Sequence, residues 1–365
     1  MLRITGILSC CFLLLACQEQ ERIHSVKTDG SLSHIPYSPE NFALQEPNGF
    51  VKMAMPADNP LTMAGVALGR HLFYDPILSR DNSRSCSSCH LQEYGFSDTS
   101  SLSRGIEGRL GKRNAIALSN LAYHYTNFFW DGRAASLEAQ ALVPVEDSLE
   151  LGNSWEEVET RLQAHFNYPV LFRQAFGITH TSEIDRSLVA KALAQFERSM
   201  ISADAKFDRY QAGQARLSES EERGRLIFFD ESEVLPTGEC SHCHIAPLFT
   251  SLEFFNNGLD NTDQPLKDGG KWQVTRNPFD QGKFKTPSLR NISLTAPYMH
   301  DGRFATLDEV IEQYNVGGHY SKNESPNVRP LGLEAQDKKD LIAFLHTLTD
   351  TSYLRREDLS NPFLR

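Results

Sequence analysis

Apolar residues recur along this chain at the three- and four-residue spacing of an α-helix, and no long stretch alternates with the two-residue period of a β-strand. The strongest pattern covers residues 183–203, which follow Ser182, a good helix N-cap. The apolar face of this segment carries Ile184, Leu188, Ala192 and Phe196. The same signals predict further helices at 155–165 after Ser154, at 307–314 after Thr306, and at 333–348. The sequence therefore predicts a mainly α fold with long loops.

One pattern occurs twice: a helix N-cap, a helix that ends in aromatic or apolar residues and an Asp, and then a Cys. The first copy consists of Thr62, Leu72-Phe73-Tyr74-Asp75 and Cys86. The second consists of Ser218, Ile227-Phe228-Phe229-Asp230 and Cys240. The Asp and the Cys are eleven residues apart in the first copy and ten in the second. We infer an internal duplication, with a first domain over 43–212 and a second over 213–365.

Each copy continues into the pentapeptide Cys-x-x-Cys-His. The two are Cys86-Ser87-Ser88-Cys89-His90 and Cys240-Ser241-His242-Cys243-His244. This motif attaches heme c, because the two sulfurs form thioethers with the porphyrin and the His supplies the proximal nitrogen to the iron. An exported chain could instead pair such cysteines as disulfides, or bind zinc through two Cys and two His. Neither alternative requires a His at the same offset twice. We therefore predict two covalently bound heme c groups, with His90 and His244 as iron ligands.

The first residues have the pattern of an export signal. An apolar run at 4–16 is too short to span a membrane and ends in Leu14-Leu15-Ala16-Cys17, which resembles the lipobox of bacterial lipoproteins. In such proteins the Cys is lipidated after cleavage, and Gln18 rather than Asp at the next position favours delivery to the outer membrane, on its periplasmic side. A plain secretory signal with an incidental Cys is the alternative. The predicted segments are a lipoprotein signal peptide at 1–16, a lipid anchor on Cys17 and a polar tether over 17–42.

The chain has seven Cys and a formal net charge of −11. Cys10 and Cys11 leave with the predicted signal and Cys17 takes the lipid, so the two heme motifs account for the remaining four. The negative charge argues against a nucleic-acid partner and disfavours docking on anionic lipid, so membrane contact is expected only through the N-terminal lipid. The charge is compatible with a basic protein partner, such as a small cytochrome.

Three further segments surround the two motifs. They are Phe-Phe-Trp-Asp-Gly-Arg-Ala-Ala-Ser-Leu at 128–137, Lys-Thr-Pro-Ser-Leu-Arg-Asn at 285–291 and Thr-Ala-Pro-Tyr-Met-His-Asp-Gly at 295–302. In this order they resemble the bacterial diheme cytochrome c peroxidase family, which includes the methylamine-utilisation protein MauG, and the resemblance runs from about residue 45 to 350. It implies two cytochrome c-like heme domains in tandem, a first heme that reacts with hydrogen peroxide and a second that receives electrons. Trp130 matches the family's bridging Trp and could relay electrons; a buried aromatic at a domain interface is the alternative.

Gln140 and Glu150 match the pair that the family places above the reactive iron. As the O–O bond of peroxide breaks, one oxygen must lose a proton and the other must gain one, and a carboxylate within reach can carry that proton. An amide can orient the peroxide without titrating. The alternative for Glu150 is a solvated surface acid.

The family usually holds a calcium ion between its domains. The matching ligands here are Asn114 and the backbone carbonyls of Thr295 and Pro297, and such hard oxygen donors suit Ca²⁺. A turn held by a capping Asn is the alternative at Asn114.

The sequence departs from many family members at the first heme. In those peroxidases a distal His occupies the peroxidatic iron until the other heme is reduced. The matching position here is Ile106, and no His occurs between His90 and His124. We predict that the first heme is open without reductive activation.

A second departure concerns the sixth ligand of the second heme. Peroxidases that use Met carry it at the position of Tyr314, where MauG also has a Tyr. We predict Tyr314 as the ligand, with Met299 as the less favoured candidate. Tyr314 could also be a core residue, because it shares a helical face with Leu307, Val310 and Ile311.

The predicted function is reduction of hydrogen peroxide to water with electrons from a small periplasmic donor such as a cytochrome c or a cupredoxin. MauG-like oxidation of a protein partner through a high-valent diheme state is the second hypothesis, because Ile106 and Tyr314 follow the MauG pattern. The third, of another class, is a non-enzymatic diheme electron carrier, which would need neither Glu150 nor an open iron. A homodimer is compatible with the sequence, and the donor cannot be identified from it.

Overall fold

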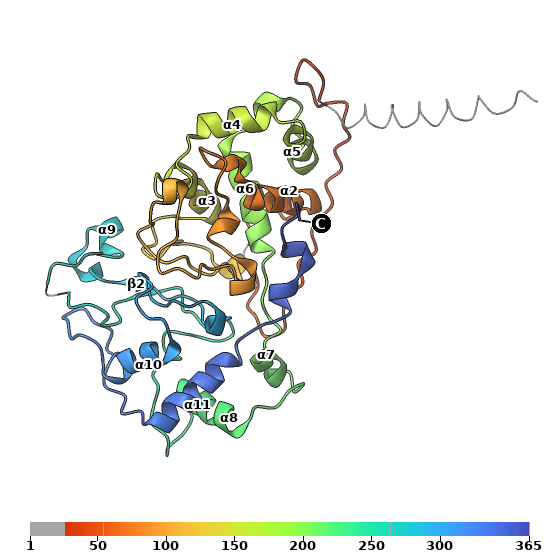
Figure 1. Ribbon diagram of the computed structural model, residues 1–365. Coiled ribbons are helices and arrows are strands. Elements are labelled where there is room, and N and C mark those ends of the chain that lie inside the picture. The colour runs from red at the N-terminus through yellow and green to blue at the C-terminus, as the bar shows by residue number, and fades with distance from the viewer. Residues whose placement is uncertain (1–25, 54, 263, 365) are drawn as a thin grey trace, which may run out of the picture.

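The computed structural model describes residues 26–53, 55–262 and 264–364 (Figure 1). The predicted signal peptide and Cys17 lie outside the described residues. Helices and turns dominate, and the two strands in the described ranges, β1 (Phe254–Phe255) and β2 (Phe284–Lys285), form one antiparallel pair. The mainly α prediction is thus confirmed. In the described ranges no helix is both long enough and apolar enough to cross a membrane.

The first half of the chain forms a unit around a crossed pair of helices, α2 and α6 (Figure 1). Gly69 lies at the crossing, where a Cβ would collide with the backbone carbonyl of Ala192, so only glycine allows this close approach. Phe73 and Phe196 meet edge to face beside it in a fully buried core. The helices are α2 (Met63–Tyr74), α3 (Leu137–Glu146), α4 (Trp155–Ala164), α5 (Tyr168–Phe176) and α6 (Arg186–Arg198).

The second half repeats this crossing with α8 and α11 (Figure 1). Gly224 occupies the position of Gly69, and a Cβ there would collide with the backbone carbonyl of Asp340. The duplication seen in the sequence is therefore a duplicated helix crossing. The helices are α7 (Lys206–Gln211), α8 (Glu219–Phe229), α9 (Trp272–Thr275), α10 (Leu307–Asn315) and α11 (Ala335–His346).

Most of the predicted helix starts are confirmed. Thr62, Ser154, Ser218 and Thr306 each accept a backbone N–H from the first turn of α2, α4, α8 and α10. The prediction of a helix over 183–203 was too long at both ends, because α6 is capped by Asp185. Glu183 instead accepts the backbone N–H groups of Thr179 and His180, which holds 181–183 in a separate short turn.

Both ends of the described chain pack on the first unit. Leu32 and Ile35, in the segment predicted as a tether, are fully buried in its core. Residues 353–359, assigned from sequence to the second domain, return to the first unit, where the Tyr353 hydroxyl donates to the Leu118 carbonyl. Figure 1 shows the C-terminus beside α2. These segments lack the periodic pattern on which the sequence-based boundaries depended.

Candidate functional site

The first Cys-x-x-Cys-His motif begins in a short 3-10 turn, Cys86–Ser88, and closes with a bond of 3.0 Å from the His90 backbone N–H to the Cys86 carbonyl. The His90 Nδ1 lies 2.8 Å from the Phe96 carbonyl, which orients the ring and leaves Nε2 as the coordinating nitrogen. Burial lowers the pKa of His90, so the ring is neutral, as a metal ligand must be. Cys86 and Cys89 are both free thiols.

The second motif repeats this arrangement. The His244 backbone N–H donates to the Cys240 carbonyl over 2.9 Å, and Nδ1 lies 3.1 Å from the Phe249 carbonyl. Burial lowers the pKa of His244 to about 4. Cys240 and Cys243 are free thiols, so the disulfide alternative is wrong for both motifs. Among the described residues, no group with ligand atoms close enough for a metal contains a motif Cys or the final His of either motif; His242 alone belongs to one, with Asp230 and Glu239.

A cavity of about 1220 Å³ lies against the first motif and reaches into the second unit. Cys86, Cys89 and His90 line one side of it. The wall also carries Arg84, Arg133 and Lys285, and the buried His124 Nε2, which has no hydrogen-bond partner among the described residues. A large cavity with two free thiols, a neutral His and cationic side chains fits a heme with its two carboxylates.

Gln140 and Glu150 both line this cavity. Gln140 lies on α3, and Glu150 follows its end in a turn where the Glu150 N–H donates to the Asp147 carbonyl over 2.9 Å. Burial raises the pKa of Glu150 to about 7, with Asp147 raising it further and Arg133 opposing the shift. This carboxyl can therefore both accept and donate a proton near neutral pH.

Ile106 lies beside this pair but does not line the cavity. Its backbone N–H donates to the Glu150 carbonyl over 2.9 Å, and its side chain occupies the space where a Cβ on Gly152 would stand. The side chain is 1% exposed, so it holds the Glu150 turn in place. Sequence reasoning missed His124, which does line the cavity; burial lowers its pKa to about 3 and nothing in its sequence context indicated this place.

Trp130 lies where the two units meet. Its indole N–H donates to the Asn114 carbonyl over 2.9 Å, and its own carbonyl accepts the Lys285 backbone N–H over 2.8 Å. Arg113 clamps the units together, since it bonds Asp131 of the first unit at 2.6 Å and Asp268 of the second at 2.7 Å. The indole is thus fixed between the halves of the molecule.

The three predicted calcium ligands also border the cavity. The Asn114 amide nitrogen faces the carbonyls of Ser100 and Ser101, each at 3.3 Å, so its Oδ1 is the atom available to an ion. Thr295 and Pro297 belong to the loop that contributes the His300 carbonyl to the Asn114 N–H, at 2.7 Å. The structure therefore brings Asn114, Thr295 and Pro297 into one region, and the ion itself stays a prediction.

Tyr314 and Met299 lie on either side of one amide in the second unit. Asn257 Nδ2 donates to the Tyr314 hydroxyl over 3.0 Å and is 3.7 Å from the Met299 sulfur. Burial raises the pKa of Tyr314 to about 12, with the Asn257 hydrogen bond opposing the shift and the Cys240 and Cys243 thiols raising it slightly further. Tyr314 therefore lies close to the second motif. Asn257 was missed because it is distant in sequence from both candidates.

The interior of the second unit is aromatic. The rings of five phenylalanines lie with centroids 4.9 to 6.4 Å apart, and Cys240 packs against the same core. These residues are Phe207, Phe228, Phe229, Phe249 and Phe344.

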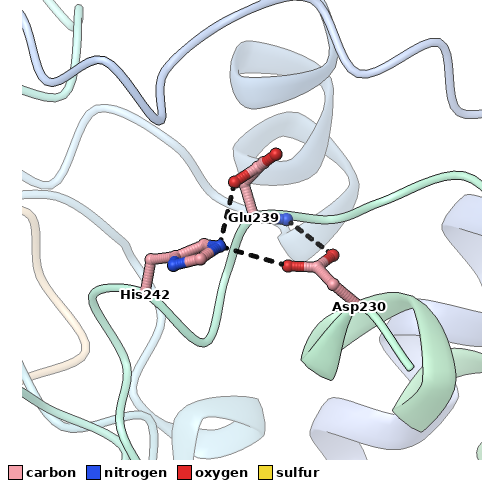
Figure 2. A group of neighbouring side chains, drawn as sticks. All are labelled: Asp230, Glu239 and His242. Carbon is pink, nitrogen blue, oxygen red and sulfur yellow. Dashed lines mark hydrogen bonds and ion pairs between the residues drawn. The ribbon is translucent and has the colours of Figure 1, made fainter.

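Two carboxylates lie beside the second motif, where Glu239 and Asp230 flank His242 (Figure 2). His242 Nε2 lies 3.1 Å from Glu239 and 3.5 Å from Asp230, and Asp230 also accepts the Glu239 N–H over 3.2 Å. Arg329 pairs with Glu239 as well. Because His242 is half exposed and both acids have other partners, this group braces the loop before the motif.

Comparison with known proteins points in one direction. A sequence model of the family described as "Di-haem cytochrome c peroxidase" matches residues 63–216. The chain is 37% identical over 339 residues to cytochrome-c peroxidase IdrP1 of Denitromonas iodatirespirans, covering 84% of this chain and 87% of that protein. It is 37% identical over 294 residues to the methylamine utilization protein MauG of Methylorubrum extorquens, covering 80% of each. A crystal structure of a MauG-like protein associated with microbial copper homeostasis superposes with a TM-score of 0.81 at 36% identity, covering 88% of this chain and 99% of that one.

Proposed function

The chain belongs to the diheme cytochrome c peroxidase family, and on that premise we propose that it reduces hydrogen peroxide to water with electrons from a small protein donor. Membership makes it an oxidoreductase that acts on peroxide and implies two covalently bound heme c groups. The reaction consumes one peroxide, two electrons and two protons and releases two waters. The observation that carries the proposal is Glu150, a carboxyl with a pKa near 7 on the same cavity as Cys86, Cys89 and His90.

Three residues of the first unit have separate roles in the reaction with peroxide: proton transfer, orientation of peroxide and positioning of the carboxyl. Bound heme supplies an iron that exchanges electrons and a face on which peroxide can bind. Glu150 takes the proton from one peroxide oxygen and returns it to the other, because its carboxyl titrates close to neutral pH. Gln140 orients peroxide through its amide. Ile106 keeps the Glu150 turn in position through the 2.9 Å backbone bond.

The residues between the units connect the two hemes. Trp130 is held by hydrogen bonds to Asn114 and Lys285, so its indole has a fixed orientation through which electrons can pass. A calcium ion at Asn114, Thr295 and Pro297 would hold the same junction. In the second unit Tyr314 is the proposed sixth ligand, and its link to Asn257 and closeness to the second motif support it over a purely structural role.

The first heme is proposed to be open in the oxidised protein. The support is local: the position that carries a distal His in many relatives is Ile106, whose side chain is buried away from the cavity. The oxidised protein should then show one high-spin heme that reacts with peroxide before any electron is added. Two low-spin hemes, and no reaction until reduction, would show this to be wrong.

A second candidate function is oxidation of a protein partner. It is favoured by Tyr314 and Ile106, which follow the MauG pattern, and by the fit to a MauG-like structure over almost its whole length. A plain electron carrier is disfavoured, since it has no use for a buried carboxyl that titrates near pH 7. Export to the periplasmic side, anchoring through Cys17 and a homodimer complete the proposal.

Steady-state peroxide consumption with reduced cytochrome c tests the function. We expect turnover by the heme-loaded protein and a large loss in Glu150→Gln. Peroxide consumption that depends on an added protein partner, and not on cytochrome c, would select the second candidate. Absence of any spectral change on adding peroxide would select the carrier.

A further inference from the structure

A second buried carboxyl borders the first cavity and has no part in the proton transfer described above. Glu197 is the penultimate residue of α6 and is 6% exposed. It lines the cavity together with Leu193, one turn earlier on the same helix. Its Oε2 is sealed from solvent and has no hydrogen-bond partner among the described residues. An unpaired polar atom in such a place is costly unless it has a function or a further partner.

The cations nearest to Glu197 are engaged elsewhere. Arg198, the next residue, forms a two-pronged pair with Glu138 of α3 at 2.6 and 3.0 Å. Arg70 of α2 donates to the carbonyls of Glu357 and Ser360 in the C-terminal segment. Arg356 donates to the Ser199 and Ile201 carbonyls just after α6 and pairs with Asp358. Within the described residues, no basic side chain forms an ion pair with Glu197.

Other titratable groups on elements packed against α6 have partners other than Glu197 or are uncharged. On α2, the Tyr74 hydroxyl donates to the Leu359 carbonyl and His71 Nδ1 faces the Ala67 carbonyl. Next to the short turn Leu121–Tyr123, His124 is neutral because burial lowers its pKa to about 3. Burial raises the pKa of Glu197 to about 8, with Arg198 lowering it and Glu138 raising it. The carboxyl therefore gains or loses its proton around pH 8, where a change of charge nearby changes its protonation.

Glu197 is electrostatically coupled to the point where the first heme is attached. Burial raises the pKa of the Cys86 thiol most, and Glu197 is the next largest cause, ahead of Cys89 and Glu150. Glu197 and Cys86, the residue that would hold the first heme, thus line the same cavity and interact electrostatically. The comparable acid of the second unit is Asp230, whose Oδ2 also has no hydrogen-bond partner among the described residues and which comes next after burial in raising the pKa of Cys240. Unlike Glu197, it pairs with His242 at 3.5 Å and does not line the cavity.

We propose that Glu197 is the proton-coupling site of the first heme, where its carboxylate binds one proton from solvent as that heme gains one electron and releases it as the electron leaves. One electron from the protein donor and one proton enter together, and the only bond made is the O–H bond of the carboxyl. The physical reason is the low dielectric of the cavity, in which an added charge is costly unless an opposite charge accompanies it. The inference rests on the proposed function for the identity of the cofactor.

The test is the reduction potential of each heme as a function of pH in the heme-loaded protein. In the unmodified protein the potential of one heme should be constant at low pH and should fall as pH rises, because reduction then takes up a proton. In Glu197→Gln, which copies the protonated form, that potential should stay at its low-pH value throughout, so the two proteins agree at low pH and separate at high pH. Glu156→Gln, the same change on the exposed face of α4, is the matched control and should behave as the unmodified protein.

An unchanged pH dependence in Glu197→Gln would overturn the inference. If that variant fails to fold, redox-difference infrared spectra of the unmodified protein with ¹³C-labelled glutamate replace it. A protonated-carboxyl band that grows on reduction and shifts with the label is expected, and its absence would also overturn the inference. Peroxide turnover measured in parallel separates the two proposals: turnover without proton coupling refutes the role of Glu197 alone, and coupling without turnover refutes the peroxidase.

Discussion

In the first unit the His90 ring is held by the Phe96 carbonyl, and in the second the His244 ring is held by the Phe249 carbonyl, at 2.8 and 3.1 Å. The two attachment motifs are therefore built alike. Cys86 and Cys240 also both pack against an aromatic core. The polar surroundings differ: Glu150 and Glu197 border the cavity of the first unit, whereas Tyr314 lies near the second motif. Each motif would hold one heme, and under the proposed function the residues around it determine whether protons or only electrons are transferred there.

This difference has a simple physical basis. Reduction of peroxide needs protons, so its site needs groups that can hold a proton out of bulk water, and burial raises the pKa of both carboxyls towards neutrality. Electron exchange by itself needs no proton donor or acceptor. Under the proposed function, the two units separate these two requirements in space.

The largest expected effect is at Glu150. Replacing it with Gln should lower peroxide turnover by about 10²- to 10⁴-fold, because the base that carries the proton is lost. In the unmodified protein kcat/KM should rise with pH through about 7, as the Glu150 carboxyl loses its proton and becomes the base. That rise should be absent from Glu150→Gln. Steady-state rates between pH 5 and 9 measure both effects.

Glu146→Gln is the matched control for that experiment, because Glu146 is an exposed carboxyl at the end of α3, just before the turn that carries Glu150. It should leave rate and pH profile unchanged. Equal losses of peroxide turnover in Glu150→Gln and Glu146→Gln would mean that the loss comes from the change in net charge and not from the carboxyl that lines the cavity.

The next prediction tests whether the ion pairs of Arg113 between the two units stabilise the protein. Arg113→Ala should destabilise the protein by about 3 kcal/mol, because the partly buried Asp268 loses its cation and the buried Asp131 keeps only Arg133. Arg109→Ala, which removes an exposed pair with Glu107, should cost under about 1 kcal/mol. Denaturant unfolding of the oxidised, heme-loaded protein measures both. A small effect at Arg113 would mean that the junction around Trp130 does not depend on this clamp.

Substitution of Tyr314 tests the proposed iron ligand of the second unit. Tyr314→Phe should change the spin state and raise the potential of one heme, since a phenolate favours ferric iron, while Met299→Leu should change neither. The effect on peroxide turnover should be smaller than that of Glu150→Gln, because no proton transfer depends on the second unit. Optical and electron paramagnetic resonance spectra measure the spin state. A spectral change in Met299→Leu but not in Tyr314→Phe would exchange the two assignments.

The sequence was sufficient for features that depend on local spacing. The two pentapeptides, the helix caps at Thr62 and Ser218 and the mainly α fold all follow from residues close together in the chain. Gln140 and Glu150 could be named only through the family resemblance, and the raised pKa of Glu150 comes from burial that no local pattern reports.

Residues brought together across the fold were missed. Asn257 reaches Tyr314 only because the loop after the second motif folds back on α10. Glu197 follows Phe196 on α6, where the helical pattern indicates the edge of the apolar face and not a cavity wall. The return of the C-terminal segment to the first unit is a tertiary contact of the same kind.

The smallest effect compares the two units at equivalent helix caps. Thr62 is buried, and its hydroxyl both accepts the Gly65 N–H at 3.0 Å and donates to the Gln195 side chain at 3.5 Å, so Ala removes both bonds. Ser218 is exposed, and half of its capping box, the bond from its N–H to Glu221, would survive loss of the hydroxyl. Thr62→Ala should therefore destabilise the protein by about 2 kcal/mol and Ser218→Ala by about 0.5 kcal/mol. Thermal unfolding followed by circular dichroism should show the lower midpoint for Thr62→Ala. If Ser218→Ala lowers the midpoint as much as Thr62→Ala, the two helix caps contribute equally to the stability of the protein.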